Sequence, residues 1–201
     1  MKHRFPVVTL VFIIILLFCF NLEIINGKIL LPGTIISRFG ITRSNAFSNQ
    51  FYRLITANIF HMNVGHLLSN IIGLIFFLSI YEILLGKSRA ILIIIISAFG
   101  GTLGSISINM VIGMVGASTI VFGVFGGLGV LLIKYENDLG RYKLIGYIVW
   151  SIDLIVICFS GYLSLKVVDQ GAHAGGFIFG IIGTHFMTYK CSYSELRTHT
   201  A

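Results

Sequence analysis

Residues 54–81 read LITANIFHMNVGHLLSNIIGLIFFLSIY, and this stretch decides the class of fold. A helix needs roughly 20 predominantly apolar residues to span a bilayer, and this run is long enough. Residues 71–81 are almost wholly apolar, whereas residues 56–70 carry histidine, asparagine and serine side chains. Polar groups are costly inside a bilayer, so their presence calls for a reason. The stretch therefore predicts a membrane-spanning helix with a polar region near its start.

Five further apolar runs extend this prediction to the whole chain. Of the 201 residues, 56% are hydrophobic and 10% are charged, against about 45–50% and about 25% in soluble domains. So few charges cannot cover the surface of a water-soluble globule. We predict an all-α membrane protein, with residues 1–201 forming a single transmembrane domain of six helices. The predicted spans are about 7–25, 54–81, 90–114, 117–133, 144–165 and 172–187.

The distribution of lysine and arginine predicts how these spans are oriented. With the N-terminus in the cytoplasm, nine of the fourteen Lys and Arg residues fall on the inner side, as the positive-inside rule favours. Both termini are therefore expected in the cytoplasm. No small-x-small cleavage site follows the first apolar run, which favours an uncleaved helix. No organelle transit segment precedes it, so a bacterial plasma membrane is the expected location.

Composition also excludes several classes of function. The net charge is +7, but no basic cluster is flanked by aromatic residues, so no nucleic-acid partner is expected. Cys19, Cys158 and Cys191 are odd in number and far apart, which predicts neither a disulfide framework nor a metal site. A small channel or transporter would require charges near the middle of several spans, and only Asp153 meets that condition.

Four polar residues stand out because their spans run in the same direction. His66 and Asn70 belong to the polar group that opens the second span, Ser118 lies at the start of the fourth, and His173 lies at the start of the sixth. All three spans run from outside to inside, so these residues are expected at one depth, facing the outside. His61 is about 140° from His66 on an ideal helix, and is therefore expected off that face.

These residue types suit acyl transfer, most simply amide hydrolysis. A serine hydroxyl is a poor nucleophile until a base accepts its proton, and histidine is the usual base. Glycines on the His173 face allow a neighbouring helix to approach closely. His66, Asn70 and backbone amides near Ser118 are candidate donors to the oxyanion that forms. Asp169 precedes His173 by four residues but falls in a predicted loop, so a Ser/His dyad is the interpretation we retain.

At these residues the chain resembles the rhomboid family of intramembrane serine proteases. The matching segments occur in the family's order over residues 50–184. Gln50–Thr56 resembles Q-x-W-R-L-x-T, His61-x4-His66-x3-Asn70 reproduces H-x4-H-x3-N, Glu82 with Gly86 resembles E-x3-G, Gly116–Thr119 stands at G-x-S-G, and Gly171–Gly176 resembles A-H-x-x-G.

The resemblance implies that Ser118 is the nucleophile and His173 the base. It implies that His66 and Asn70 form the oxyanion site, and that Phe122 takes the aromatic position that packs on the histidine ring. The implied fold is a six-helix bundle with an outward-open aqueous cavity. The implied activity is cleavage of transmembrane protein substrates near the extracytoplasmic surface, without a cofactor. The alternative is a catalytically inactive rhomboid-like protein that binds transmembrane helices. The oligomeric state is not predicted.

Two features depart from the family pattern. Thr119 replaces the second glycine of the nucleophile motif and places a β-branched side chain beside Ser118. The tryptophan–arginine pair that is common in the first external loop is not found beside Arg38 or Arg43. The resemblance therefore does not predict how that loop is held.

Overall fold

The structure is a computed structural model that describes residues 5–25, 28–42, 44–45, 48–108, 113–140, 142–163 and 169–193. Arg43 and the side chain of Asp153 lie outside the described part. Most described residues are helical, in keeping with the predicted class. The elements are α1 (Val7–Leu22), β1 (Ile24–Ile25), β2 (Lys28–Ile29), α2 (Pro32–Phe39), α3 (Arg53–Thr56), α4 (Val64–Gly73), η1 (Leu74–Leu78), α5 (Ser79–Leu85), α6 (Lys87–Ile108), α7 (Ser118–Lys134), α8 (Tyr142–Leu163) and α9 (Gln170–Thr188).

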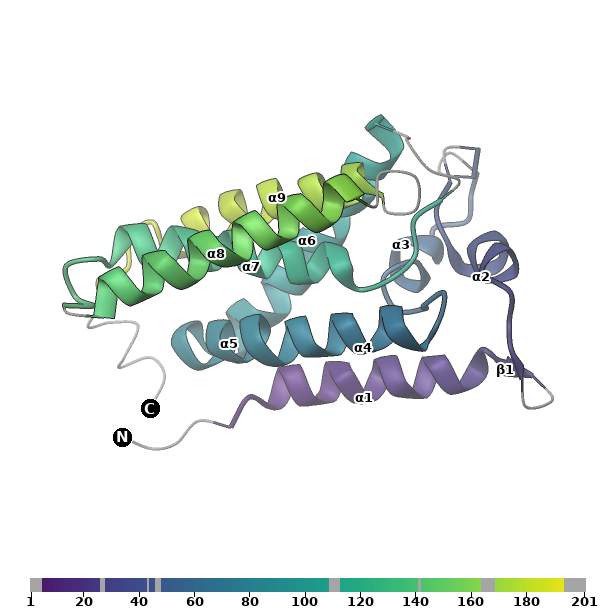
Figure 1. Ribbon diagram of the computed structural model, residues 1–201, viewed down its shortest axis with the longest axis horizontal. Coiled ribbons are helices and arrows are strands. Elements are labelled where there is room, and N and C mark those ends of the chain that lie inside the picture. Colours follow the sequence, from purple (N-terminus) through teal and green to yellow (C-terminus); the bar gives the residue numbers. More distant parts are fainter. Residues whose placement is uncertain are drawn as a thin grey trace.

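The long helices alternate in direction along a common axis (Figure 1). α1, α6 and α8 run toward the end of the molecule that carries β1, α2 and α3, on the right in Figure 1. α4, α7 and α9 begin at that end and run back. The three helices that carry the predicted site residues therefore start at the same end of the molecule.

The second predicted span forms one helical run over residues 64–85, made of α4, the π-helical turn η1 and α5. The run begins after Asn63, whose extended backbone and side-chain oxygen cap the helix by accepting the His66 N–H at 2.9 Å. It ends at Gly86, whose φ of 85° lies in the left-handed region. The helix thus begins ten residues after the start of the apolar run, because a capping residue interrupts it.

Two helices in the described part are long and apolar enough to cross a membrane. These are Val64–Leu85 and Lys87–Ile108, each of 22 residues. At 1.5 Å per residue such a helix is about 33 Å long, which matches a hydrocarbon core of about 30 Å. Shorter apolar helices occur at Val7–Leu22, Ser118–Lys134 and Lys143–Ile152.

Glycines bring α9 into backbone contact with α6 and α7. A Cβ added at Gly175 would lie 2.2 Å from the Gly100 carbonyl oxygen on α6, and one at Gly176 would lie 2.3 Å from the Thr119 carbonyl oxygen on α7. Both distances are too short for any side chain, so only glycine permits this packing. The close approach positions the start of α9 beside the start of α7.

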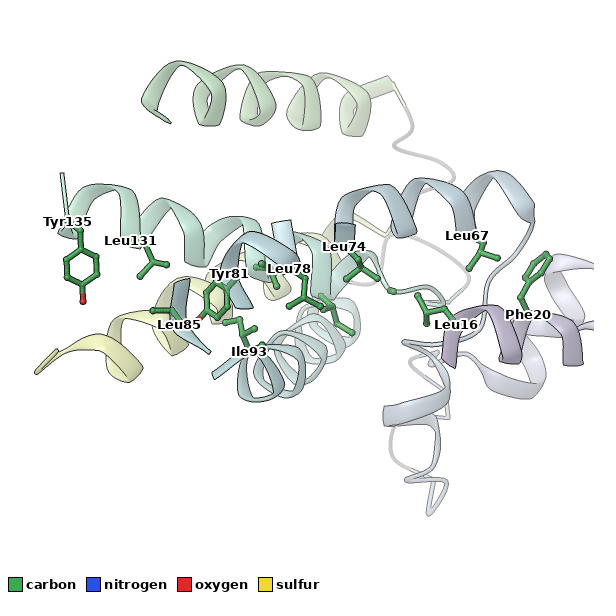
Figure 2. Packing of buried hydrophobic residues seen from close by; sticks show 14 residues of the cluster. Leu16, Phe20, Leu67, Leu74, Leu78, Tyr81, Leu85, Ile93, Leu131 and Tyr135 are labelled. Atoms are coloured by element: carbon green, nitrogen blue, oxygen red, sulfur yellow. The ribbon is translucent and has the colours of Figure 1, made fainter. Parts of the chain in front are cut away.

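An apolar cluster joins α1 to residues of α4, η1, α5, α6 and α7 (Figure 2). Leu16 of α1, Leu74 of η1 and Ile93 of α6 are among its fully buried members. The start of α1 is held by Glu82, whose carboxylate accepts hydrogen bonds from the backbone N–H groups of Val8 and Thr9 at 2.9 Å each. This carboxylate is buried, but three donors, including the Thr9 hydroxyl, compensate its desolvation.

Arg53 anchors the segment between α2 and α3. Its guanidinium donates to the carbonyl oxygens of Gly40 at 2.7 Å and Ser37 at 2.9 Å, and to the Gln50 side chain at 2.5 Å. The residue is only 8% exposed. Five N–H donors in a fixed plane suit this role, since several carbonyl groups can be satisfied at once.

Candidate active site

Ser118 and His173 are in hydrogen-bonding contact at the end of the molecule where α7 and α9 begin. The distance between His173 Nε2 and Ser118 Oγ is 2.9 Å. Ser118 is the first residue of α7, and His173 lies in the first turn of α9. Both residues are of intermediate burial. The structure therefore brings together the two residues that the sequence singled out.

Phe122 supports the His173 ring. Their ring centroids are 4.0 Å apart, and the ring planes are inclined by 15°, which is a stacked arrangement. Phe122 follows Ser118 by four residues, and therefore projects from the same face of α7. The stacking restricts rotation of the imidazole while Nε2 contacts the serine.

Asp169 does not contact the imidazole of His173. It caps α9, with one carboxylate oxygen accepting the Ala172 N–H at 2.9 Å and the other accepting the Ser105 hydroxyl at 2.5 Å. His173 Nδ1 is buried and has no hydrogen-bond partner among the described residues. Asp169 therefore acts on the backbone of α9 and on Ser105.

His66 and Asn70 lie against the backbone that leads into Ser118. A Cβ added at Gly116 would lie 2.4 Å from His66 Cε1 and 3.4 Å from Asn70 Nδ2. Gly116 has φ of 119°, which favours glycine, and the missing side chain leaves room for the His66 ring. Both side chains therefore reach the segment two residues before the serine.

His61 contacts both Asn70 and the backbone of Ala117. The helical-face argument did not predict these contacts. It is fully buried, and its Nε2 lies 3.0 Å from Asn70 Nδ2 and 3.4 Å from the Ala117 N–H. Its Nδ1 lies 3.2 Å from the Ile59 carbonyl oxygen, which can only accept, so we assign the ring proton to Nδ1. The 140° offset did not apply, because α4 begins only at Val64. The extended backbone before that residue turns His61 toward Asn70.

A rhomboid domain is matched by residues 48–190, which cover the matched site segments and most of the described helices. This chain belongs to the rhomboid family. The family has a helical membrane fold and consists of integral membrane proteins.

Several curated proteins are similar to this rhomboid chain. Rhomboid-like protease 3 of Toxoplasma gondii is 30% identical over 149 residues, which are 71% of this chain and 54% of that protein. RHOMBOID-like protein 4 of Arabidopsis thaliana is 36% identical over 65% of this chain and 32% of its own length. Rhomboid protease GluP of Bacillus subtilis is 27% identical over 87% of this chain and 34% of its own length. The chain thus spans about half or a third of these relatives.

The departure from the rhomboid pattern at Thr119 is accommodated locally. The Thr119 hydroxyl donates to Asn58 Oδ1 at 2.6 Å, and a Cβ at Gly101 would lie 2.4 Å from Thr119 Cγ2. The residue is fully buried. Its bulk therefore lies between α6 and the segment before α4, where a glycine provides the space.

The anchor of the first loop was also missed by the sequence argument. That argument considered Arg38 and Arg43, whereas Arg53 makes the contacts. The signal was available in the match of Gln50–Thr56 to Q-x-W-R-L-x-T, in which tyrosine takes the place of tryptophan.

Among the described residues, no group of three or more His, Cys, Asp or Glu side chains is placed to hold a metal ion.

Proposed function

We propose that this chain is an intramembrane serine endopeptidase that cleaves transmembrane protein substrates near the extracytoplasmic membrane surface. The observation that most supports the proposal is the 2.9 Å contact between His173 Nε2 and Ser118 Oγ. A base within hydrogen-bond reach of a serine hydroxyl is the geometry that nucleophilic catalysis requires. Family membership and relatives named as proteases add to this support.

The proposed reaction proceeds through an ester on Ser118. His173 Nε2 accepts the hydroxyl proton while Ser118 Oγ bonds to the substrate carbonyl carbon. The imidazolium then gives this proton to the amide nitrogen as the C–N bond breaks, releasing the amine product. A water molecule, deprotonated by His173, then attacks the ester carbon. The bond from this carbon to Ser118 Oγ breaks, the imidazolium returns the proton to Oγ, and the carboxylic acid product leaves. No cofactor or metal takes part in these steps.

The proposed oxyanion site combines side-chain and backbone donors. His66 and Asn70 approach Gly116, two residues before Ser118. α7 begins at Ser118, and the N–H groups of Ile120 and Val121 already bond the Ala117 carbonyl oxygen, so those of Ser118 and Thr119 are the ones without an acceptor from the helix. Such donors stabilise the negative charge that develops on the carbonyl oxygen. Phe122 is proposed to hold the His173 ring in place by stacking.

The proposal extends to how the chain sits in the membrane. Six spans would enclose an aqueous cavity open to the outside, with both termini in the cytoplasm of a bacterial cell. The common starting end of α4, α7 and α9 supports one outward-facing site (Figure 1). Nine of fourteen Lys and Arg residues then lie on the inner side, which supports the same orientation.

A fluorophosphonate probe tests the assignment of the nucleophile and base. We expect the full chain in detergent to be labelled covalently, and labelling to be lost in Ser118→Ala and in His173→Ala. The matched control is Ser107→Ala, because this serine is exposed on α6 and only donates to the Leu103 carbonyl oxygen of its own helix. Labelling that persists in Ser118→Ala contradicts the proposal.

Proteolysis itself is tested with a reporter that carries one transmembrane helix with helix-destabilising residues at its outer end. Wild type should cleave the reporter, and Ser118→Ala should not. A wild-type protein that binds the reporter but neither cleaves it nor reacts with the probe would instead be an inactive rhomboid-like binding protein.

A further inference from the structure

Glu23 is a buried carboxyl group that the proposed mechanism does not use. It directly follows α1, and its side chain is fully buried. Its main-chain oxygen accepts the Leu30 N–H at 2.9 Å, next to the pairing of β1 with β2. Among the described residues Glu23 forms no ion pair, and its Oε2 has no hydrogen-bond partner. Burying an acid without a cation is costly, so the contact made by its other oxygen is informative.

That other oxygen holds the backbone of His61. Glu23 Oε1 accepts the His61 N–H at 2.8 Å, although the two residues are 38 positions apart in the chain. A buried backbone N–H that lacks an acceptor is costly, so this contact holds the position of His61. The end of α1 is thereby tied to the turn before α4, at the position that carries the His61 ring.

The His61 ring contacts both parts of the candidate oxyanion site, the Asn70 side chain and the backbone before Ser118. Nε2 accepts from Asn70 Nδ2 at 3.0 Å and from the Ala117 N–H at 3.4 Å. One contact orients the Asn70 amide, and the other fixes the residue before Ser118. A shift of the His61 backbone would therefore displace a side-chain donor and the start of α7 together.

We propose that Glu23 is a positioning residue that, through His61, aligns Asn70 and the backbone at Ala117 for stabilising the oxyanion. This inference rests on the proposed protease function. Glu23 touches neither Ser118 nor His173, so it acts on the donors and leaves the dyad in contact. Misplacing catalytic groups by about 1 Å can cost about 100-fold in rate.

The test measures how fast a fluorophosphonate labels Ser118 at several probe concentrations, which separates the labelling rate constant kinact from the affinity KI. In Glu23→Ala, the His61 N–H loses its acceptor, and we expect kinact to fall by about tenfold to 100-fold. KI should change by less than about twofold, because the probe site is otherwise intact. Glu23→Gln retains an oxygen acceptor and should restore kinact to within about threefold of wild type.

Glu82→Ala is the matched control for a general loss of stability. Glu82 also ties α1 to the bundle through backbone N–H groups, but at the other end of that helix. This variant should unfold at a lower temperature, while its folded fraction should keep the wild-type kinact. If Glu23→Ala does not fold, Glu23→Asp replaces it, because the shorter side chain breaks the same hydrogen bond.

Three outcomes overturn the inference. One is an unchanged kinact in Glu23→Ala or in its replacement. Another is an equal loss of kinact in Glu23→Ala and Glu82→Ala, which would reduce Glu23 to a structural tie. The third is a wild-type protein that is not labelled at Ser118, which overturns the proposed function as well. In the first two outcomes wild type reacts normally, so they refute the role of Glu23 alone.

Discussion

His66 and Asn70 reach the segment before Ser118 in different ways. The His66 ring packs on the Cα of Gly116, and it also meets the His61 ring edge-on, with centroids 5.2 Å apart. Asn70 is buried, and one of its amide N–H groups is used by His61 Nε2. An amide nitrogen has two N–H donors, so the other remains for a reactant. Asn70 therefore has one amide N–H held by His61 and a second that no described contact uses.

At the residue scale we expect His66→Ala and Asn70→Ala each to lower kcat far more than they change KM. Removing one oxyanion donor in a serine protease costs about 100-fold to 1,000-fold in kcat, because the donor is needed mainly in the transition state. Steady-state cleavage of the single-helix reporter is the measurement. Ser69→Ala is the control, since this exposed hydroxyl only donates to the His66 carbonyl oxygen. Unchanged kcat in both variants would remove these residues from the oxyanion role.

At the scale of single elements, α9 combines a capped start with a glycine-lined face. Asp169 satisfies the N–H of Ala172 and, through its main-chain oxygen, the N–H of His173 at 3.2 Å. Further along, a Cβ at Gly180 would lie 1.9 Å from the Gly123 carbonyl oxygen on α7. The cap fixes where the helix begins and the glycines fix how closely it packs. Together they determine where the imidazole lies.

Gly180→Ala should therefore destabilise the fold by about 1–3 kcal/mol, the usual cost of overpacking, because backbone atoms cannot move aside as a side chain can. Denaturant-induced unfolding in mixed micelles measures the change. Gly33→Ala on α2 is the matched control, since a Cβ there meets nothing within 4 Å. Equal stability of the two variants would show that α7 and α9 are not packed backbone to backbone.

At the scale of the whole molecule, the long helices run between two ends that carry different elements (Figure 1). β1, α2, α3 and the start of α7 lie at one end, while the start of α1 and the end of α7 lie at the other (Figure 1). The Arg53 contacts with Gly40 and Ser37 belong to the first end. In the proposed orientation this first end faces outward.

Cysteine labelling in intact cells tests that orientation. In a background without native cysteines, Gly33→Cys should react with a membrane-impermeant maleimide, whereas Asn137→Cys should react only after the cells are permeabilised. Gly33 lies on α2, and Asn137 is an exposed residue after α7, at the opposite end. The two sites thus serve as controls for each other. The reverse pattern would place the candidate active site on the cytoplasmic side and contradict the proposed topology.

The sequence by itself determined the properties that depend on local composition and spacing. An excess of apolar residues indicates a membrane protein wherever the helices pack, and the polar starts of three co-directional runs identified Ser118 and His173 as partners. These arguments need only the helical period and the thickness of a bilayer. The residue at which a helix begins was harder to predict, because a single capping residue such as Asn63 sets the start of α4 inside an apolar run.

Only the tertiary structure decided which groups hold the site in place. Glu23, His61 and Asn70 form a chain of contacts between segments far apart in the sequence. Thr119 is tolerated because Gly101 lies opposite on another helix. Asp169 turned out to serve the start of α9 and a neighbouring serine instead of the imidazole. Each contact is set by the distance and direction of groups on different elements, and spacing along one helix does not contain that information.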